Sequence, residues 1–275
     1  MVVWLGDARV RIFSFGGGVQ STAVLALQAM GELADPFDVY LLADTGDEHP
    51  GTYDYLEEFH RPLAESCGAE LHTLKRTWKD GSTYSILENI DRLKTALPIP
   101  VYMEGDDGRP GKPWRRHCTQ DWKVEVIDKW LRKNGATADA PVECGMGISV
   151  DEIHRARPST VDYKILTYPL LAAGITRAGC YEIIDRAGLP PAPRSACFYC
   201  PFSSTERWRE LRKDQPDLFQ QAIELEEELS ARTQARFGTK VFLSRKGRLA
   251  DLDDQLAFSF DLDEPDSCDS GHCFT

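Results

Sequence analysis

The sequence predicts an α/β fold: a doubly wound, mostly parallel sheet with helices on both faces, followed by a C-terminal helical extension and an acidic tail. Three observations predict this class. Short apolar runs with strand character alternate with segments of helical periodicity, a pattern typical of βαβ units. No run of about 18 apolar residues occurs, so we expect no membrane-spanning segment. The chain has 275 residues, enough for one large α/β domain or for a domain with an appendage.

The first predicted unit joins a buried strand at 10–15 to a helix at 21–30. Three consecutive glycines lie at the junction: Gly16, Gly17 and Gly18. Bare backbone lets N–H groups approach a ligand closely, and the helix dipole favours an anion, so phosphate is the ligand that this turn favours. Ser21 and Thr22 add hydroxyl groups at the same place. The turn matches neither a Walker A loop nor a dinucleotide fingerprint, and a purely structural turn is the alternative.

The same alternation continues along the chain. A second strand at 38–44 leads into Asp44 and Thr45. The further expected elements are a helix at about 52–67, a strand at 70–76, a helical stretch near 82–95, a Pro/Gly-rich loop at 98–113, a helix at 119–133 and strands at 141–149 and 163–171. Ligands of open α/β sheets collect at the carboxyl ends of the strands, so Asp44 and Thr45 should lie on the same rim as the glycine turn.

The C-terminal third predicts a helical region and a tail. Ser203 and Glu206 form a capping-box pattern that begins a charged helical region reaching Phe237, and Pro216 divides this region into two helices. We therefore expect three parts. They are a nucleotide-binding α/β domain with a cysteine cluster over 1–200, a helical extension over 201–250, and an acidic, cysteine-containing tail over 251–275.

Charge is distributed unevenly. The net charge is −12, and the eight acids after Arg248, with no Lys or Arg among them, leave −4 for the rest of the chain. The chain outside the acidic tail therefore has no general electrostatic affinity for nucleic acid. The exception is the stretch "RPGKPWRRHCTQDWK", which is either a solvated basic loop or a platform for a polyanionic substrate. Its basic and aromatic residues are Arg109, Lys112, Trp114, Arg115, Arg116, Trp122 and Lys123.

The cysteines predict a second centre of chemistry. The start, "MVVWLGDARVR", has an acidic residue and no small-residue cleavage site, so we expect a cytoplasmic protein whose eight cysteines are reduced. Cys197 and Cys200 form a C-x-x-C, which in a reducing compartment indicates a metal or redox centre. A structural zinc site and buried free thiols are the alternatives.

Several segments together resemble one protein superfamily. "SFGGGVQST" is similar to the PP-loop, S-G-G-x-D-S, of the adenine nucleotide α-hydrolases, which include ATP pyrophosphatases and the APS/PAPS reductases. Four further segments resemble those of sulfonucleotide reductases: "LLADTGDEHPGTYDYLEEF", "RHCTQDWKVEVI", "GMGISVDEIHRA" and "SACFYCPF". The resemblance covers about residues 10–205, and it is greatest to the PAPS reductase-like proteins of phages and bacteria.

This resemblance implies an adenine-nucleotide site for ATP with Mg²⁺, or for APS or PAPS. The implied binding residues are Ser14, Gly16, Gly17, Gly18, Gln20, Ser21, Thr22, Asp44, Thr45, Gly147 and Arg155. The chain departs from the family at Gln20, where ATP pyrophosphatases have an aspartate associated with the metal on the leaving pyrophosphate. It departs again at Ile148, where an arginine is usual.

The resemblance also implies a 4Fe-4S cluster held by Cys118, Cys197 and Cys200. His117 occupies the position of one expected cysteine, so the fourth ligand is His117, Cys180 or a tail cysteine, or the fourth iron is open and suited to a labile sulfide. Two tail cysteines resemble the C-terminal cysteine of the reductases and are expected to carry sulfur: Cys268 and Cys273. A regulatory tail is the alternative.

Three functions are open at this point. The favoured one is an ATP-dependent sulfur transferase with an iron–sulfur cluster, which receives sulfur from a donor such as a cysteine desulfurase. It would thiolate an acceptor such as a nucleic acid, as in tRNA thiolation or DNA phosphorothioation. The second is an APS/PAPS reductase that releases sulfite, and the third is a non-catalytic iron–sulfur or nucleotide-sensing module. The first is favoured because the reductases' C-terminal E-C-G-x-H motif is absent.

Overall fold

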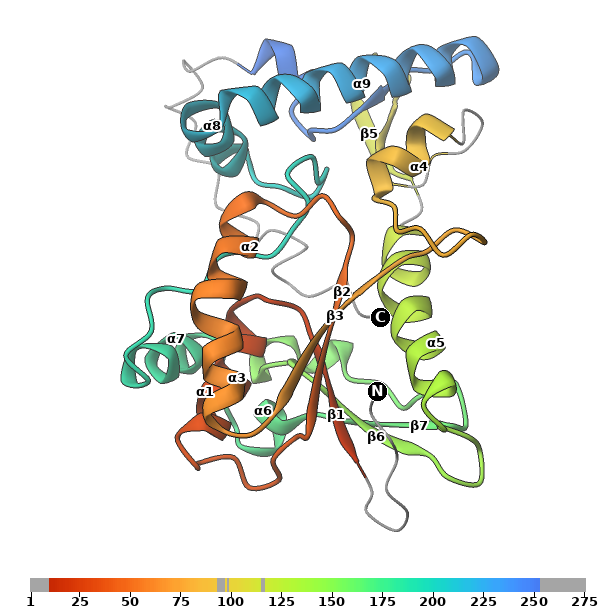
Figure 1. The fold of residues 1–275 in the computed structure, drawn as a ribbon. Coiled ribbons are helices and arrows are strands. Elements are labelled where there is room, and N and C mark those ends of the chain that lie inside the picture. Colours follow the sequence, from red (N-terminus) through yellow and green to blue (C-terminus); the bar gives the residue numbers. More distant parts are fainter. Residues whose placement is uncertain (1–9, 93–96, 98, 115–116, 253–275) are drawn as a thin grey trace.

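A five-stranded parallel sheet forms the centre of the protein in a computed structural model that describes residues 10–92, 97, 99–114 and 117–252 (Figure 1). The strands are β1 (Arg11–Phe15), β2 (Val39–Asp44), β3 (Glu70–Lys75), β6 (Val142–Met146) and β7 (Lys164–Thr167), in the order β3-β2-β1-β6-β7. All four neighbouring pairs are parallel. The α/β prediction is confirmed. The order changes direction between β1 and β6, where open α/β sheets bind their ligands.

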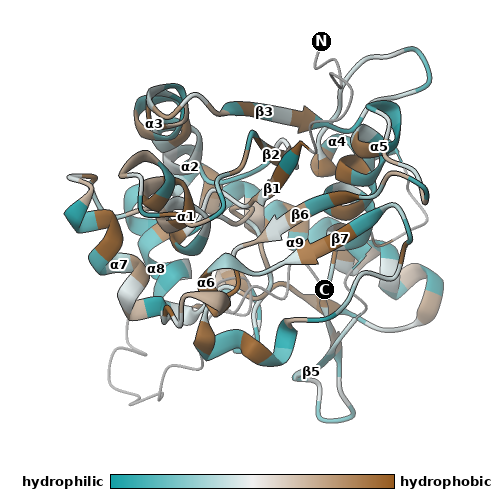
Figure 2. Ribbon diagram, turned by 90° about the horizontal axis from the view of Figure 1, so that it is seen from below, coloured by the Kyte–Doolittle hydropathy of each residue, from teal (hydrophilic) through white to brown (hydrophobic). Residues whose placement is uncertain are grey.

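Helices cover both faces of this sheet, as Figure 2 shows. One face packs on α1 (Val19–Ala29), α3 (Arg61–Ser66) and α7 (Arg177–Arg186), and the other on α5 (Glu125–Lys133). Along β1, Phe13 and Phe15 point into the first core and Ile12 into the second. Because both faces are covered, the central strands β1 and β2 are almost fully buried and mostly apolar.

A second core lies above the carboxyl edge of the sheet in Figure 1. It is enclosed by α4 (Ile86–Arg92), α8 (Thr205–Asp214), α9 (Pro216–Phe237) and a small antiparallel sheet of β4 (Tyr102–Glu104), β5 (Pro110–Pro113) and β8 (Val241–Phe242). Its largest buried side chains are Trp122 and Trp208. The prediction of a loop over 98–113 is therefore wrong, since a tight turn at Gly105–Gly108 brings β4 and β5 into register.

The remaining elements are short. They are α2 (Pro50–Tyr55), the π-helical turns η1 (Leu56–His60) and η2 (Thr119–Val124), the 3₁₀ turns η3 (Val150–Arg155) and η4 (Leu249–Asp251), and α6 (Pro169–Ala172). The strand expected at 163–171 ends at Thr167 because Pro169 begins α6. Helix α7 was not predicted. Within the described residues, no helix is long and apolar enough to cross a membrane.

The capping-box prediction is wrong by one residue. Ser204 is the N-cap of α8, with extended backbone, and its hydroxyl accepts a hydrogen bond from Arg207 N. Glu206 is then at the second helical position, where its negative charge interacts favourably with the helix dipole. It cannot form the reciprocal hydrogen bond of a capping box, which needs the third position. The predicted break at Pro216 is confirmed, since α8 ends at Asp214 and α9 begins at Pro216.

Candidate functional site

The glycine turn joins β1 to α1 at the carboxyl edge of the sheet. Gly17 has φ +72°, in the left-handed region that favours glycine, and Gly18 is the N-cap of α1. Within the described chain no side chain caps α1, so its first backbone N–H groups are left for a ligand. Two neighbouring segments line the turn: a Cβ at Gly17 would lie 3.6 Å from Thr52 Cγ2 and 3.9 Å from Ser195 Cβ.

The two hydroxyl groups after the turn bond within the helix. Ser21 Oγ and Thr22 Oγ1 donate to the Gly18 carbonyl oxygen at 2.9 and 3.0 Å. Thr22 is fully buried, and its hydroxyl also lies 2.8 Å from His60 Nε2. The backbone of the turn, more than these hydroxyls, is therefore the group offered to a phosphate.

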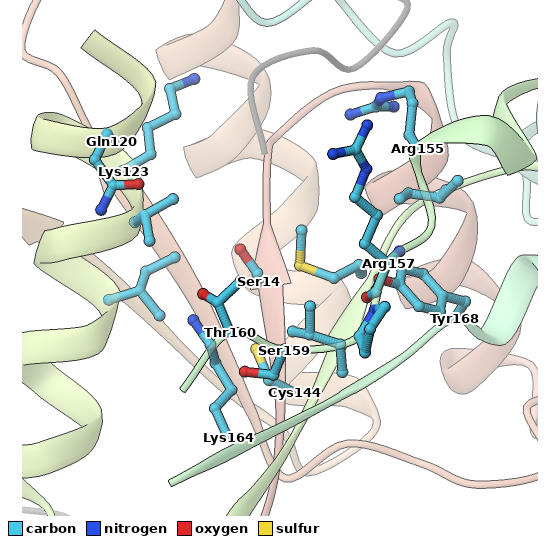
Figure 3. Close-up of a pocket in the computed structure, with 16 residues that line it drawn as sticks. Ser14, Gln120, Lys123, Cys144, Arg155, Arg157, Ser159, Thr160, Lys164 and Tyr168 are labelled. Atoms are coloured by element: carbon cyan, nitrogen blue, oxygen red, sulfur yellow. The ribbon is translucent and has the colours of Figure 1, made fainter. Parts of the chain in front are cut away.

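A cavity of about 230 Å³ opens beside β1, β6 and β7, on the α5 side of the sheet (Figure 3). Of the expected nucleotide residues, Ser14 and Arg155 line it. Figure 3 shows Gln120 and Lys123 entering from one wall and Arg155 and Arg157 from the opposite wall, with Ser14 between them. We call this the cationic pocket. Sequence reasoning did not assign several of its polar residues to it: Gln120, Lys123, Arg157, Ser159, Thr160, Lys164 and Tyr168.

Carboxylates of the protein neutralise three of the four cations in the cationic pocket. The pairs are Lys123 with Glu48 at 3.4 Å, Arg155 with Glu152 at 2.5 Å, and Lys164 with Asp128 at 2.6 Å. Arg157 is exposed and, among the described residues, is not paired with a carboxylate. The walls also include apolar side chains, among them Ile127, Met146, Ile148 and Leu166. The pocket thus combines apolar surface with a positive rim, an arrangement that suits an anionic ligand with a flat apolar ring.

A second cavity is lined by all three cysteines of the predicted cluster: Cys118, Cys197 and Cys200. We call it the cysteine cavity. Thr45 also lines it, and its hydroxyl lies 3.3 Å from Cys197 Sγ. Burial raises the pKa of Cys197 well above its ordinary value; the nearby Glu48 carboxylate raises it further, and Lys123 opposes this. Within the described residues, no three His, Cys, Asp or Glu side chains are close enough to hold a single metal ion.

Cys180 lies in a different core from the other three cysteines. It is fully buried on α7 in the core shared with α1, whereas Cys118 and Cys197 pack against the second core. Burial raises the pKa of Cys180 to about 12. The structure does not bring Cys180 to the cysteine cavity, because the face of α7 that carries it packs against α1. Cys268 and Cys273 lie outside the described residues.

The other expected nucleotide residues mainly hold the rim in place. Asp44 is buried, and its Oδ1 accepts from Gly46 N at 2.8 Å and from Tyr53 Oη at 2.7 Å. Gly147 lies against the start of α1, where a Cβ would be 3.3 Å from Ser21 N and 3.4 Å from the Gln20 side chain. This close approach explains why a glycine follows β6.

The described part of the basic stretch does not form one aromatic platform, and Arg115 and Arg116 lie outside the described residues. Trp122 is buried in the second core, where Tyr84 packs edge-on against it, so it cannot stack with a ligand. Trp114 is 47% exposed at the end of the β4–β5 hairpin. The prediction of a paired aromatic platform is therefore wrong for Trp122, whose side chain helps to form the core.

Lys123 connects the cationic pocket and the cysteine cavity, because it lines both. Its partner Glu48 accepts a hydrogen bond from Ser195 Oγ at 3.1 Å, and Ser195 lies against Gly17 and Gly18. The glycine turn, the cationic pocket and the cysteine cavity are thus neighbours. Sequence reasoning missed Glu48 and Ser195, although both lie within the quoted motifs, four residues after Asp44 and two before Cys197.

Comparisons with known proteins find similarity among solved structures. No protein-family model matches the chain, and no curated protein sequence matches it. Among solved structures, the chain is similar to phosphoadenylyl-sulfate (PAPS) reductase from Candida auris in its phosphate complex. The TM-score is 0.44 and the identity 15%, over 68% of this chain and 77% of that one. At this level of similarity, the α/β assignment rests on the strand order of this chain itself.

Proposed function

We propose that this protein is an ATP-dependent sulfur transferase. The observation that carries the proposal is that Lys123 lines both the cationic pocket and the cysteine cavity, so that a bound nucleotide and a bound sulfur would be neighbours. The acceptor oxygen would attack the α-phosphorus of ATP and release pyrophosphate. Sulfide would then displace AMP from the activated acceptor, with no change in oxidation state.

The nucleotide would bind across the switch point of the sheet. Its phosphates would lie on the backbone of the glycine turn and the N-terminus of α1, which favour negative charge. The rest of the molecule would occupy the cationic pocket, near Ser14 and Arg155. The uncompensated charge of Arg157 supports an anionic ligand here, since an anion would supply the partner that the described residues do not.

A 4Fe-4S cluster with three cysteine ligands is supported by the cysteines that line one cavity. Cys118, Cys197 and Cys200 come from two chain segments and line one cavity. Thiolates on different iron atoms of a cluster lie farther apart than the ligands of one ion, consistent with the absence of a single-ion site among the described residues. When bound, such a cluster would supply an iron able to hold sulfide. The chain's own contribution is Lys123, whose charge favours the Cys197 thiolate that ligation requires.

The tail cysteines would supply electrons where sulfur arrives as a persulfide. Sulfane sulfur from a donor such as a cysteine desulfurase needs two electrons before it leaves as sulfide. The thiols of Cys268 and Cys273 would provide them by closing a disulfide. Truncation before Ser267 should then spare nucleotide binding and stop transfer from a persulfide donor to a nucleic-acid acceptor. Full turnover by the truncated chain would leave the tail with a regulatory role.

The alternative function is reductive cleavage of APS or PAPS with release of sulfite. Gln20, in the first turn of α1, favours it: the side chain is neutral, so the turn itself offers no carboxylate for the Mg²⁺ of a triphosphate. Calorimetry with ATP, APS and PAPS separates the two functions. The sulfur transferase should bind ATP and release pyrophosphate when the acceptor is present. Preferential binding of PAPS with sulfite release would establish the reductase and overturn the proposal.

The cluster has a separate test that does not depend on activity. Anaerobically purified protein should be brown and contain iron and sulfide, and Cys118→Ser, Cys197→Ser and Cys200→Ser should each lose them. Cys67→Ser is the matched control, because Cys67 follows α3 and packs against the first core, far from the cysteine cavity. Stoichiometric zinc without iron in the anaerobic protein would contradict the cluster.

A further inference from the structure

A third cavity, of about 260 Å³, shares no lining residue with the cationic pocket or the cysteine cavity. It lies between α8, the segment 193–203 and His49 at the start of α2. Phe198 lines it, whereas the neighbouring Cys197 and Tyr199 line the cysteine cavity. The third cavity is therefore on the opposite side of the C-x-x-C loop, and the proposed sulfur chemistry does not use it.

The cavity offers hydrogen-bond donors. Arg194 and Arg207 line it, and the Arg207 guanidinium donates to the Arg194 carbonyl oxygen at 3.0 Å. His49 Nδ1 accepts from Gly51 N at 3.2 Å, so the proton of the neutral imidazole is on Nε2. Burial, and then the charge of Arg207, lower the pKa of His49, which keeps the ring neutral. These groups together suit a carboxylate.

The same cavity also offers hydrogen-bond acceptors. Glu210 and Asp214 lie one turn apart on α8, on the face that lines the cavity with Arg207. Their negative charges raise the pKa of His49, against the lowering effect of burial and Arg207. Among the described residues, neither carboxylate forms a hydrogen bond or an ion pair. Like charges at this spacing destabilise a helix, so the fold itself gives no reason for the pair.

Two aromatic side chains also line the cavity. Phe198 and Trp208 line the cavity, and Trp208 is only 1% exposed. Its indole N–H has no hydrogen-bond partner among the described residues, although buried donors are normally satisfied.

We propose that this cavity binds the zwitterion of an α-amino acid. Its carboxylate would lie on Arg207 and His49, its ammonium group would lie between Glu210 and Asp214, and its side chain would pack against the aromatic residues. A phosphate would be repelled by the two carboxylates, and a polyamine by the two arginines. A small molecule with both charges would satisfy both kinds of group that line the cavity.

Calorimetry on the full chain with the twenty L-amino acids tests this inference. The best binder should lose affinity about tenfold or more when it lacks its ammonium or its carboxylate group, because charge-assisted hydrogen bonds are lost. Arg207→Gln and Asp214→Asn should cause similar losses. Lys213→Gln and Glu206→Gln are the controls, since both residues are on α8 but do not line the cavity, and they should bind as the unaltered protein does.

Three results would overturn the inference: no amino acid binds at millimolar concentration, Arg207→Gln binds as well as the unaltered chain, or inorganic phosphate binds in competition with the amino acid. The readout uses neither iron, nucleotide nor sulfur transfer. Failure of the proposed function would therefore leave this test unchanged, and failure here would leave the nucleotide and cysteine sites unchanged.

Discussion

At the residue scale, the backbone conformation of Gly17 determines where the N–H groups of the candidate phosphate site lie. Its φ of +72° places it in a region that costs a residue with a side chain about 1–2 kcal/mol. The Cβ contacts at 3.6–3.9 Å are ordinary, so the expected penalty comes from the backbone and not from overlap. A relaxed turn would misplace the N–H groups that precede α1.

Gly17→Ala should therefore lower the free energy of unfolding by about 1–2 kcal/mol and weaken ATP binding. Gly31→Ala is the matched control: Gly31 has the same φ of +72° just after α1, with open space where its Cβ would lie. It should have the same stability cost and normal binding. Urea unfolding and calorimetry measure the two effects, and equal ATP affinity in both variants would reduce Gly17 to a structural turn.

His60 is the second residue with a specific consequence. It is fully buried beside Phe15 and Tyr55, with Thr22 as its hydrogen-bond partner, and burial lowers its pKa to about 3. Between pH 3 and about 6.5 the unfolded chain binds a proton here and the folded protein does not. This contribution to stability is complete above pH 6.5 and is lost as the pH falls, by up to about 1.4 kcal/mol per pH unit.

His60→Phe should therefore lose less stability than the unaltered protein when the pH falls from 7 to 4. The phenyl ring keeps the aromatic contacts, and Thr22 keeps its bond to the Gly18 carbonyl oxygen. Urea midpoints at several pH values measure the difference, with the half-buried His72→Gln as control. Parallel curves for His60→Phe and the unaltered chain would show that His60 does not titrate in this way.

At the scale of elements, α9 holds the C-terminal part of the second core through Glu226. This side chain is 2% exposed and accepts from Leu243 N at 2.7 Å and from Leu249 N at 2.9 Å. The Glu226 carboxylate thus accepts from the backbone N–H group just after β8 and from the one that begins η4. These side-chain hydrogen bonds attach two short segments to a long helix, in place of the regular backbone hydrogen bonds that a longer strand or helix would form.

Glu226→Ala should destabilise the protein by about 2–4 kcal/mol, because two buried N–H groups lose their acceptor. The adjacent Glu227→Ala should cost less than about 1 kcal/mol, since Glu227 and its partner Arg248 are both about half exposed. Urea denaturation of both variants measures the contrast. Similar losses would mean that the N–H groups find water in the variant.

At the scale of the whole molecule, the second core joins segments from both sides of residue 200. Ile86, Ile90 and Trp122 share it with Trp208 and Leu229. The chain before residue 200 therefore depends on α8 and α9 to cover its own apolar side chains. The segments before and after residue 200 therefore share one buried core.

A chain ending at Ser204 should expose this apolar surface, bind a hydrophobic dye and aggregate. A chain ending at Leu252 should do neither, because it keeps every buried residue of the second core. Dye fluorescence and size-exclusion chromatography of both chains give the comparison. A monomeric, dye-free product ending at Ser204 would show that the sheet folds without its C-terminal helices.

The sequence by itself determined the main sheet, because strand-like runs, the most apolar of them at β1 and β2, alternate with segments of helical periodicity. It also identified Ser14 and Arg155 at one cavity, and Cys118, Cys197 and Cys200 at another. The small antiparallel sheet was missed because its strands have two to four residues, and β4 pairs with a segment near residue 241. Strands this short carry no periodic signal.

Tertiary structure alone decided which charges face one another. Glu48 meets Lys123 across 75 residues and Ser195 across 147, and no local pattern predicts such a pair. Tertiary packing also buried Trp122 and Cys180, which the sequence placed among the functional candidates. The physical reason is the distance along the chain over which each effect acts. Secondary-structure propensity and periodicity act over a few residues. Burial and electrostatics depend on which distant segments the fold brings together.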